Sequence, residues 1–534
     1  AILSTSISAT NSKTNFESKL VSTDKNDVEY QDYITSFSMS NDGRYVLFSS
    51  ALSNFVDGDT NGGSDLFLKD MTTGSVKRVN TDSNGNESNG AGFFGVLTND
   101  GRYVAFASTG TTLVPGDSNG QPDIFLKDTT TGSIARVNTD SNGNQANGTS
   151  SVLSISQDGR YVVFSSLASN LVSGDTNGIN DIFVKDVQTG ITTRVNTDSA
   201  GGQGNGTTDG FGNITSDGRY IIFSSTSSNL VAGDSNGAGD VFIKDIQTGT
   251  TTRVSTNSSG VQGSGQSNLG TISSNGRYVT FMSIATNMVT GDSNGQGDIF
   301  VKDLYTGEVR LVSTDENGNQ ANGTSIYSAI SDDGRYVTFG TYATNLVSGI
   351  NDGTYNIYSK DLATGRIAGF AVDDFEGDDF RSLISSDGRY IVSVVGGSSP
   401  LYTGSYSDSK NIFMAFNPLI EQDSVSRFTW FNLKTQSAAQ EAQNWIDRYI
   451  DEVNGVQGQV GAFQSRFRVA ANTLSVTTEN IKTAESRIRD IDVAEESSLL
   501  VRSQILQEAG VAVLAQANLQ PEVALSLLNL KEIQ

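Results

Sequence analysis

Short apolar runs alternate with polar turns through most of the chain, in a unit that recurs at intervals of 58, 58, 59, 58, 58 and 54 residues. The tetrapeptide D/N-G-R-Y marks each unit, with glycines at Gly43, Gly101, Gly159, Gly218, Gly276, Gly334 and Gly388. In the third unit an apolar segment at 152–155 leads into a D-G turn, where glycine permits the positive φ of a tight hairpin. Arg160–Phe164, Asp181–Asp186 and Thr193–Asn196 follow as β-branched and aromatic runs. The pattern therefore predicts four short antiparallel strands per unit.

Seven such units predict an all-β propeller, because four-stranded sheets repeated around an axis leave only short, protected edges. The third strand occurs seven times, the last at Asn411–Phe416, whereas the fourth follows only the first six. A separate copy of the fourth strand stands at Lys19–Asp24. We expect this N-terminal strand to close the last blade, which gives a seven-bladed propeller over residues 19–417 after an arm or linker at 1–18. The repeat resembles the TolB-type, WD-like β-propeller family, and this resemblance implies the fold without a function.

An acidic loop, G-D-x-N-G-x-x-D, precedes the third strand in five units. Its candidate metal ligands are Asp59, Asn61, Asp65, Asp117, Asn119, Asp123, Asp175, Asn177, Asp181, Asp234, Asn236, Asp240, Asp292, Asn294 and Asp298. This spacing of side-chain oxygens is similar to that of calcium loops, so calcium is the candidate cofactor. The pattern is shorter than an EF-hand loop and lacks its closing glutamate. The alternative is that Asp and Asn form Asx turns.

The sixth unit departs from this loop pattern, with Asn351, Asp352 and Asn356, and the seventh has nothing comparable. Two other recurrent cations are the arginine of D-G-R-Y and the lysine of F-V-K-D. We expect them to pair with neighbouring carboxylates or to flank the strands; a central channel lined by cations is the alternative. The repeated tyrosines and phenylalanines are expected in the core.

Composition narrows the chemistry open to the chain. It contains no Cys and no His, which excludes thiol nucleophiles, Ser-His-Asp triads and the common zinc and haem ligand sets. A carboxylate-based enzyme is left, but no carboxylate pair stands apart from the repeated turn motif, so we expect no enzyme. The net charge of −24 argues against nucleic acid or an anionic membrane as a partner. No stretch reaches the length of a membrane span.

Composition shifts near Asn417-Pro418, after which helix-forming residues dominate 418–534. Apolar residues then recur every seven positions, at Ile446, Val453, Val460, Phe467, Leu474, Ile481 and Ile488. The companion positions are Tyr449, Val456, Phe463, Ala470, Thr477, Ala484 and Ile491. This repeat predicts an all-α coiled-coil region, which needs a partner helix to cover its apolar seam.

A further helical stretch at 498–518, and a short one at 525–528, are apolar on most sides. We expect other chains to bury them, because the chain offers no second long helix. The predicted assembly interface combines both regions: Ile446, Tyr449, Val453, Val456, Val460, Phe463, Phe467, Leu474, Ile481, Ile488, Ile505, Leu506, Val513, Leu514, Leu525 and Leu528.

The C-terminal residues resemble the C-terminal region of bacterial flagellin over about 440–530. The resemblance rests on Ala484–Asp492, on Arg502–Gly510, on Val513–Asn518 and on Gly461–Phe467, which is similar to the family's G-A-x-Q-N-R-F. It implies a secreted, extracellular filament subunit of the flagellum, whose C-terminal helix pairs with an N-terminal helix while the central region projects outward. Residues 1–18 are short, polar and strand-like, so either that N-terminal half lies outside this sequence or a separate flagellin chain supplies the helix.

Two functional interpretations follow. The first is a structural filament subunit that displays its propeller on the filament surface and contacts other copies of itself, a flagellin chain, or both. The second is an adhesin or binding module, in which the filament presents a propeller that recognises a glycan or a protein.

Overall fold

The computed structural model describes residues 18–24, 26, 34, 36–350, 353–371, 381–396, 410–420, 465, 468, 472–483, 486, 493–519 and 521. The chain divides into two compact units, Ala1–Glu421 and Gln422–Gln534. The first is a β-propeller and the second contains helix, so the predicted multidomain fold class is confirmed.

Seven four-stranded antiparallel sheets form the blades of the propeller. The first three are β2 (Phe37–Met39), β3 (Tyr45–Ser50), β4 (Asp65–Asp70) and β5 (Val76–Arg78); β6 (Gly92–Leu97), β7 (Tyr103–Ser108), β8 (Asp123–Asp128) and β9 (Ile134–Arg136); and β10 (Ser150–Ile155), β11 (Tyr161–Ser166), β12 (Asp181–Asp186) and β13 (Thr192–Arg194). The next three are β14 (Thr208–Ile214), β15 (Tyr220–Ser225), β16 (Asp240–Asp245) and β17 (Thr251–Arg253); β18 (Ser267–Ile272), β19 (Tyr278–Ser283), β20 (Asp298–Asp303) and β21 (Val309–Leu311); and β22 (Ser325–Ile330), β23 (Tyr336–Thr341), β24 (Asn356–Asp361) and β25 (Ile367–Ala371). The seventh blade is built from β26 (Ser382–Ile384), β27 (Tyr390–Gly396), β28 (Lys410–Phe416) and the N-terminal β1 (Ser18–Leu20).

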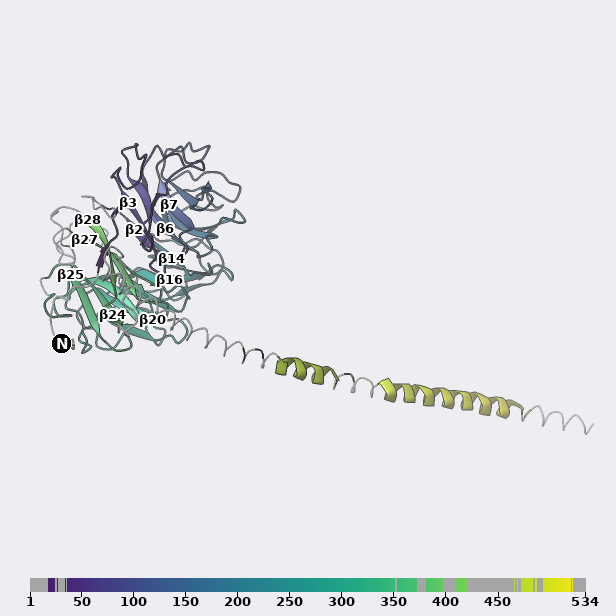
Figure 1. Ribbon diagram of the computed structural model, residues 1–534. Helices are drawn as coiled ribbons and strands as arrows, with labels where there is room; N and C mark the ends of the chain where they lie inside the picture. Colours follow the sequence, from purple (N-terminus) through teal and green to yellow (C-terminus); the bar gives the residue numbers. More distant parts are fainter. Residues whose placement is uncertain are drawn as a thin grey trace, which may run out of the picture. The chain divides into compact units, whose positions relative to one another are not determined.

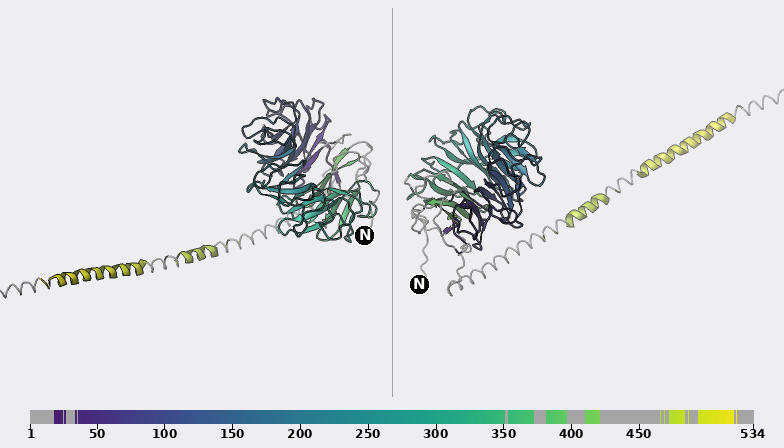
Figure 2. Two further views of the ribbon diagram at one scale, coloured as in Figure 1. Left: turned by 180° about the vertical axis from the view of Figure 1, so that it is seen from behind. Right: turned by 90° about the horizontal axis from the view of Figure 1, so that it is seen from above.

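The blades follow one another around a ring, with the purple first blade beside the green last blade (Figures 1 and 2). The first strands of successive blades contact one another from β2 through β26, so these strands face the axis. In each of the first six blades, a phenylalanine of the second strand lies opposite a phenylalanine or tyrosine of the third, as with Phe164 and Phe183, whose ring centroids are 5.7 Å apart. Both rings are fully buried, which confirms the expectation that the repeated phenylalanines form the core.

The hairpin turn after each first strand is set by local hydrogen bonds. In the first blade, Asp42 accepts the hydroxyl of Ser40 (2.6 Å) and the backbone N–H of Arg44 (2.9 Å), while Gly43 has a φ of +73°. Glycine takes this left-handed conformation without the steric cost that a Cβ would add. The D-G dipeptide therefore terminates the first strand and starts the second.

A closed circle of hydrogen bonds links all seven of these turns. The residue before each D/N-G dipeptide donates its backbone N–H to the corresponding residue of another blade: Asn41 to Asn99 (2.6 Å), Asn99 to Gln157 (2.8 Å), Gln157 to Ser216 (3.1 Å), Ser216 to Ser274 (3.0 Å), Ser274 to Asp332 (2.7 Å), Asp332 to Ser386 (2.8 Å) and Ser386 to Asn41 (2.7 Å). The side-chain amide of Asn41 also donates to the hydroxyl of Ser274 (2.8 Å). Because the last link returns to the first blade, the circle joins the blades at this end of the axis.

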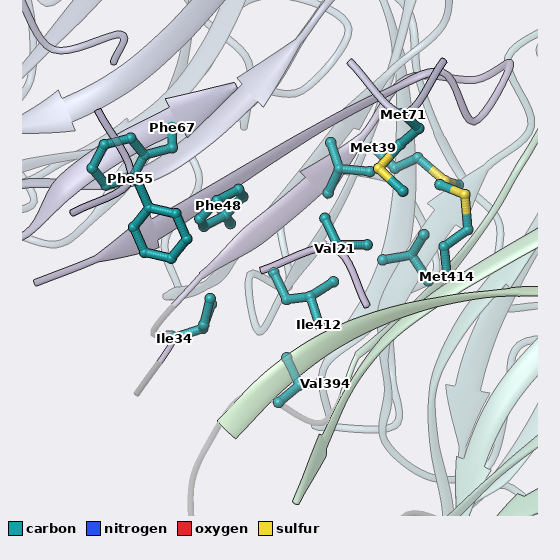
Figure 3. Packing of buried hydrophobic residues seen from close by; sticks show 12 residues of the cluster. Val21, Ile34, Met39, Phe48, Phe55, Phe67, Met71, Val394, Ile412 and Met414 are labelled. Carbon is teal, nitrogen blue, oxygen red and sulfur yellow. The ribbon is translucent and has the colours of Figure 1, made fainter. Parts of the chain in front are cut away.

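The N-terminal strand closes the ring, as the sequence predicts. In β1, Lys19 lies opposite Met414 of β28 in an antiparallel pair, and the backbone N–H of Val21 donates to the carbonyl of Ile412 (2.7 Å). A shared apolar core joins the first blade to the last: Val21, Ile412 and Met414 pack with Phe48 (Figure 3). The propeller is therefore closed by contacts between residues far apart in the sequence. For example, the hydroxyl of Ser22 donates to the side-chain oxygen of Asn411, which is 389 positions away.

The recurrent cations have different partners. Six D-G-R-Y arginines pair with the aspartate that ends the third strand of the same blade, as Arg160 does with Asp186 (2.7 Å), which agrees with expectation. The F-V-K-D lysines differ from expectation, because their main partners are backbone carbonyls of the preceding blade. Lys127, for example, is buried and donates to the carbonyls of Thr81 (2.9 Å) and Asp82 (2.8 Å).

The second unit contains two described helical stretches, at 472–483 and 493–519. Every described residue between 465 and 521 is exposed to solvent. None of the described helices combines the length and the apolarity needed to cross a bilayer.

Candidate functional site: the acidic loops and the C-terminal helices

The five acidic loops connect the second and third strands of the first five blades, and their asparagine organises each loop. In the second blade, the amide oxygen of Asn119 accepts the backbone N–H of Gln121 (2.8 Å). Its amide nitrogen donates to Asp123 (3.3 Å) and to the carbonyl of Ala146 (2.9 Å). The same turn is made by Asn61, Asn177, Asn236 and Asn294. This is the Asx-turn arrangement, in which the asparagine oxygen serves its own loop.

Each pair of loop aspartates in the second, third and fourth blades is bridged by an arginine and a glutamine. Arg136 lies 3.0 Å from Asp123 and 3.7 Å from Asp117, and the Gln145 amide donates to both carboxylates, at 2.7 and 2.9 Å. The equivalent groups are Arg194 and Gln203 around Asp175 and Asp181, and Arg253 and Gln262 around Asp234 and Asp240. Each pair of carboxylates therefore has a positive charge and a bridging amide donor from its own chain.

The second aspartate of each loop is the more deeply buried. Asp123 is fully buried and accepts the amide of Asn138 (2.8 Å). Burial raises the pKa of Asp123, against the opposing effect of Asn138 and of the Arg136 charge. Burial raises the pKa of Asp240 and Asp298 in the same way. A buried carboxylate of this kind needs a neighbour that carries a positive charge or donates a hydrogen bond. In most of these loops, nearby side chains provide such neighbours.

The fifth blade lacks the bridging arginine, because Leu311 stands at its position. Asp292 and Asp298 are both buried, and the amide of Gln320 donates to each at 2.8 Å. Ser313 donates a further hydrogen bond to Asp298 (2.6 Å). Every hydrogen bond described for this pair of carboxylates comes from a neutral donor.

The first blade lacks the bridging glutamine, because Glu87 stands at its position. Carboxylate oxygens of Asp59, Asp65 and Glu87 lie within 4.8 Å of one another. Arg78 pairs with Glu87 at 2.5 Å, with Asp65 at 3.2 Å and with Asp59 at 3.5 Å. One guanidinium therefore stands among three carboxylates in this loop.

The two outer carboxylates of the first loop differ in their electrostatics. Burial, and then the charge of Asp65, raises the pKa of Asp59 to about 6. Burial also opposes ionisation of Glu87, but hydrogen bonds from Thr60 and Asn61 and the charge of Arg78 outweigh it and lower the pKa of Glu87 to about 2. The Oδ2 atom of Asp59 is buried without a hydrogen-bond partner.

The bridging residues were not singled out from the sequence, although a signal for them exists. The arginine follows the first loop aspartate by 19 residues and the glutamine follows it by 28, as Asp117 precedes Arg136 and Gln145. Of the divergent sixth loop, Asn356 begins β24, whereas Asn351 and Asp352 lie outside the described residues.

The C-terminal helices carry the other predicted site. The residues of the predicted assembly interface that the structure describes are Leu474, Ile481, Ile505, Leu506, Val513 and Leu514, all of them largely exposed. The remaining ones lie outside the described residues: Ile446, Tyr449, Val453, Val456, Val460, Phe463, Phe467, Ile488, Leu525 and Leu528. Further large apolar side chains are exposed on 493–519, at Val493, Leu499, Leu500, Val501, Val511 and Leu519. Apolar exposure on this scale is typical of a surface that takes part in protein–protein contacts.

Comparison with known proteins agrees with the resemblance seen in these residues. Residues 444–528 match the bacterial flagellin C-terminal helical region. Flagellin B of Vibrio cholerae is 42% identical over 97 residues, which cover 18% of this chain and 26% of that protein. Flagellin of Bacillus subtilis is 45% identical over 83 residues, which cover 16% of this chain and 27% of that protein. The chain thus spans about a quarter of the length of these curated relatives.

Two solved structures are similar to this chain. Putative TolB from Agrobacterium tumefaciens has a TM-score of 0.33 and 17% identity over 52% of this chain and 80% of that one. Oligogalacturonate lyase from Vibrio parahaemolyticus has a TM-score of 0.46 and 13% identity over 76% of this chain and 95% of that one. The propeller fold itself is established by the seven-sheet topology of this chain.

Proposed function

We propose that this chain is a structural subunit of a bacterial flagellar filament, which assembles through its C-terminal helices and displays a β-propeller on the filament surface. The match of residues 444–528 to the flagellin C-terminal helical region carries this proposal. The filament would place the chain outside the cell. Its partners would be further copies of itself, a flagellin chain that supplies an N-terminal helix, or both.

The exposed apolar residues of 493–519 support assembly with other chains. Leu506 is 64% exposed and Leu514 is 66% exposed, so most of each side chain is left uncovered by the described residues. Burying a leucine side chain contributes about 1.5–3 kcal/mol, so a helix with many exposed leucines and valines gains strongly from a partner. In proteins, most of a helix's stability comes from packing of this kind.

The propeller is suited to a projecting domain because it needs no partner to complete its sheets. Its last blade is closed by β1 of the same chain, and apolar clusters join neighbouring blades. The unit could therefore be carried on a filament without taking part in the filament core. We expect no catalytic role for it.

Removal of residues 418–534 tests this proposal. The truncated chain should keep the strand-rich circular dichroism of the propeller and should be absent from sheared, purified filaments. Mass spectrometry of filaments made with the full chain should detect it together with the chain that supplies the pairing helix. Incorporation of the truncated chain at the level of the full chain would contradict assembly through the C-terminal helices.

A second function, a filament-presented binding module, is favoured by strained backbone on the inner strands. Among the described non-glycine residues, Phe94, Leu269 and Tyr327 have positive φ, of 44°, 53° and 50°, in three different blades. Such conformations cost on the order of 1–3 kcal/mol each and cluster where a side chain must be aimed for function. The rings of Phe211 and Tyr327 lie 6.4 Å apart, and the guanidinium of Arg381 lies 5.9 Å from the Phe211 ring.

These aromatic residues come from different blades, so they gather near the propeller axis. Flat aromatic faces beside a guanidinium are suited to sugar rings, which makes a glycan the favoured ligand and a protein the alternative. Phe211→Ala should abolish binding to a glycan array while filament incorporation remains unchanged. The exposed Tyr305→Ala on the outer surface is the matched control. Equal glycan binding by the wild-type chain, Phe211→Ala and Tyr305→Ala would contradict this second function.

A further inference from the structure

We propose that the loop of the first blade is a divalent-cation site of the calcium class, formed by Asp59, Asp65 and Glu87, and that the other acidic loops are not cation sites. The proposal is independent of filament assembly. Of the five similar loops in the sequence, it selects one as a cation site, because the side chains that contact the aspartates differ from loop to loop.

The difference arises from a single exchange of a donor for an acceptor. In blades two to five, a glutamine amide donates to both loop aspartates, at distances between 2.7 and 3.2 Å. Glu87 occupies that position in the first blade, and an ionised carboxylate can only accept hydrogen bonds. The first loop therefore lacks the amide donor that bridges the two aspartates in the other loops. It has a third negatively charged group in place of that donor.

Charge arithmetic in the first loop leaves room for one divalent ion. Asp59, Asp65 and Glu87 supply three negative charges when ionised, and Arg78 supplies one positive charge. The sum is −2, which one Ca²⁺ neutralises. In the second blade, by contrast, the two aspartates and Arg136 sum to −1, and the Gln145 amide already occupies the space between the carboxylates.

An orphaned buried atom points to the ligand independently of the cluster. The Asp59 side chain is 2% exposed, and its Oδ2 atom has no hydrogen-bond partner. A buried carboxylate oxygen left without a donor destabilises the folded state, so a ligand that binds this atom recovers that loss. A proton shared with Glu87 or a metal ion would satisfy it. The cluster consists of oxygens alone, which is the ligand type that Ca²⁺ prefers.

The fifth loop shows why two acidic groups are insufficient for the assignment. Unlike the first loop, it has no bridging arginine, but the Gln320 amide donates to both Asp292 and Asp298 at 2.8 Å. Among the described atoms, neither of these carboxylates has a buried oxygen without a hydrogen-bond partner. The first loop is the one in which both a third carboxylate and an unsatisfied buried oxygen occur.

Two reciprocal substitutions test the site in the full chain. Glu87→Gln gives the first loop the residue that four other loops already contain, so the propeller should fold. Gln145→Glu gives the second loop the arrangement of the first. After treatment with a chelator, calorimetric titration with CaCl₂ should show one ion per wild-type chain with a Kd on the order of 0.1–1 mM, the range of extracellular modules. Glu87→Gln should weaken binding at least about tenfold, because tenfold corresponds to only about 1.4 kcal/mol.

Gln145→Glu should add a second ion, and the melting temperature of the wild-type chain should rise with calcium relative to chelator, since a ligand that binds only the folded state stabilises it. Three results would overturn the proposal. These are no binding to the wild-type chain at about 10 mM Ca²⁺, undiminished binding to Glu87→Gln, or about five ions bound per wild-type chain. Undiminished binding to Glu87→Gln would move the ion to another loop, and five ions would restore the equivalence of all the loops.

Discussion

Gly43 of the first blade lies against the ring of Tyr390 in the last blade. A Cβ at Gly43 would come within 2.7 Å of the Cδ2 atom of Tyr390. The same close contact joins the D/N-G-R-Y glycine of the other later blades to the tyrosine of the blade before, as with Gly101 and Tyr45, but at Gly276 the Cβ would lie 3.2 Å from Thr215 and 3.5 Å from Tyr220. The motif thus does two things: its glycine makes the hairpin turn, and it lets neighbouring blades approach.

We predict that Gly101→Ala destabilises the propeller by about 2–5 kcal/mol. Alanine at a φ of +65° costs about 1–2 kcal/mol in backbone strain. The added methyl would also meet Tyr45 at 2.8 Å, and overpacking of this kind adds about 1–3 kcal/mol. The measurement is the free energy of unfolding by denaturant.

Gly116→Ala is the matched control for this prediction. Its φ is +76°, but nothing lies within 4 Å of the position of its Cβ, so only the backbone cost of about 1–2 kcal/mol applies. Equal destabilisation by the two substitutions would mean that contact with the tyrosine adds nothing.

The buried lysines give a second prediction, because each ties its blade to the one before. Lys127 donates to the carbonyls of Thr81, Asp82 and Gly132, at 2.8–2.9 Å. Lys127→Met should keep the volume but leave these carbonyls without a donor, at a cost of about 2–4 kcal/mol in the free energy of unfolding. Lys77→Met, at an exposed position of β5, should change it by no more than about 0.5 kcal/mol. Similar effects of both would show that the carbonyl contacts contribute little.

Much of the propeller could be predicted from the sequence because its signals are local. The turn at Gly159, the β-branched strand after it and the stray fourth strand at Lys19–Asp24 are each visible within a few residues. The contacts that fill the loops are not local. Arg136 and Gln145 reach Asp117 from 19 and 28 positions away, on another strand and another loop. The acidic motif alone is therefore equally typical of a cation loop and of an internal ion pair.

The lysine contacts are a second example of partners that cannot be identified from the sequence alone. Lys127 follows an apolar strand and precedes an aspartate, a pattern that suggests a surface ion pair. Its partners are backbone carbonyls 45 and 46 positions earlier, in the preceding blade. Carbonyl groups leave no mark in the sequence, since every residue has one, so only the packing of the blades identifies this partner.

The strand-end ion pairs predict part of the dependence of stability on pH. Hydrogen bonds from Arg160 lower the pKa of Asp186 to about 2. A carboxylate with a lowered folded-state pKa stabilises the protein above its ordinary pKa of 3.8, and this stabilisation is lost as the pH falls through about 2. Asp186→Asn keeps the acceptor for the backbone N–H groups of Gln188 and Thr189 but loses the charge.

We therefore expect the free energy of unfolding of Asp186→Asn to lie below that of the wild-type chain at pH 5, with the difference shrinking toward pH 2. Denaturant unfolding at several pH values measures this difference directly. A difference that stays constant from pH 5 to pH 2 would show that the charge of Asp186 does not contribute.

The C-terminal helix gives the last prediction, which concerns assembly. Leu506 lies in the stretch 493–519, is 64% exposed and belongs to the predicted interface, whereas its neighbour Gln507 is polar. If another chain buries Leu506, a glutamate there must be desolvated without a partner, which costs several kcal/mol. Leu506→Glu should therefore reduce incorporation into sedimented filaments by more than about tenfold, since about 1.4 kcal/mol already corresponds to tenfold. Gln507→Glu adds the same charge one residue along the helix and should reduce incorporation less. The melting temperature of the propeller should be the same in both variants, because the helix belongs to a separate unit. Normal incorporation of Leu506→Glu, with its propeller folded, would show that this surface is not buried in the filament.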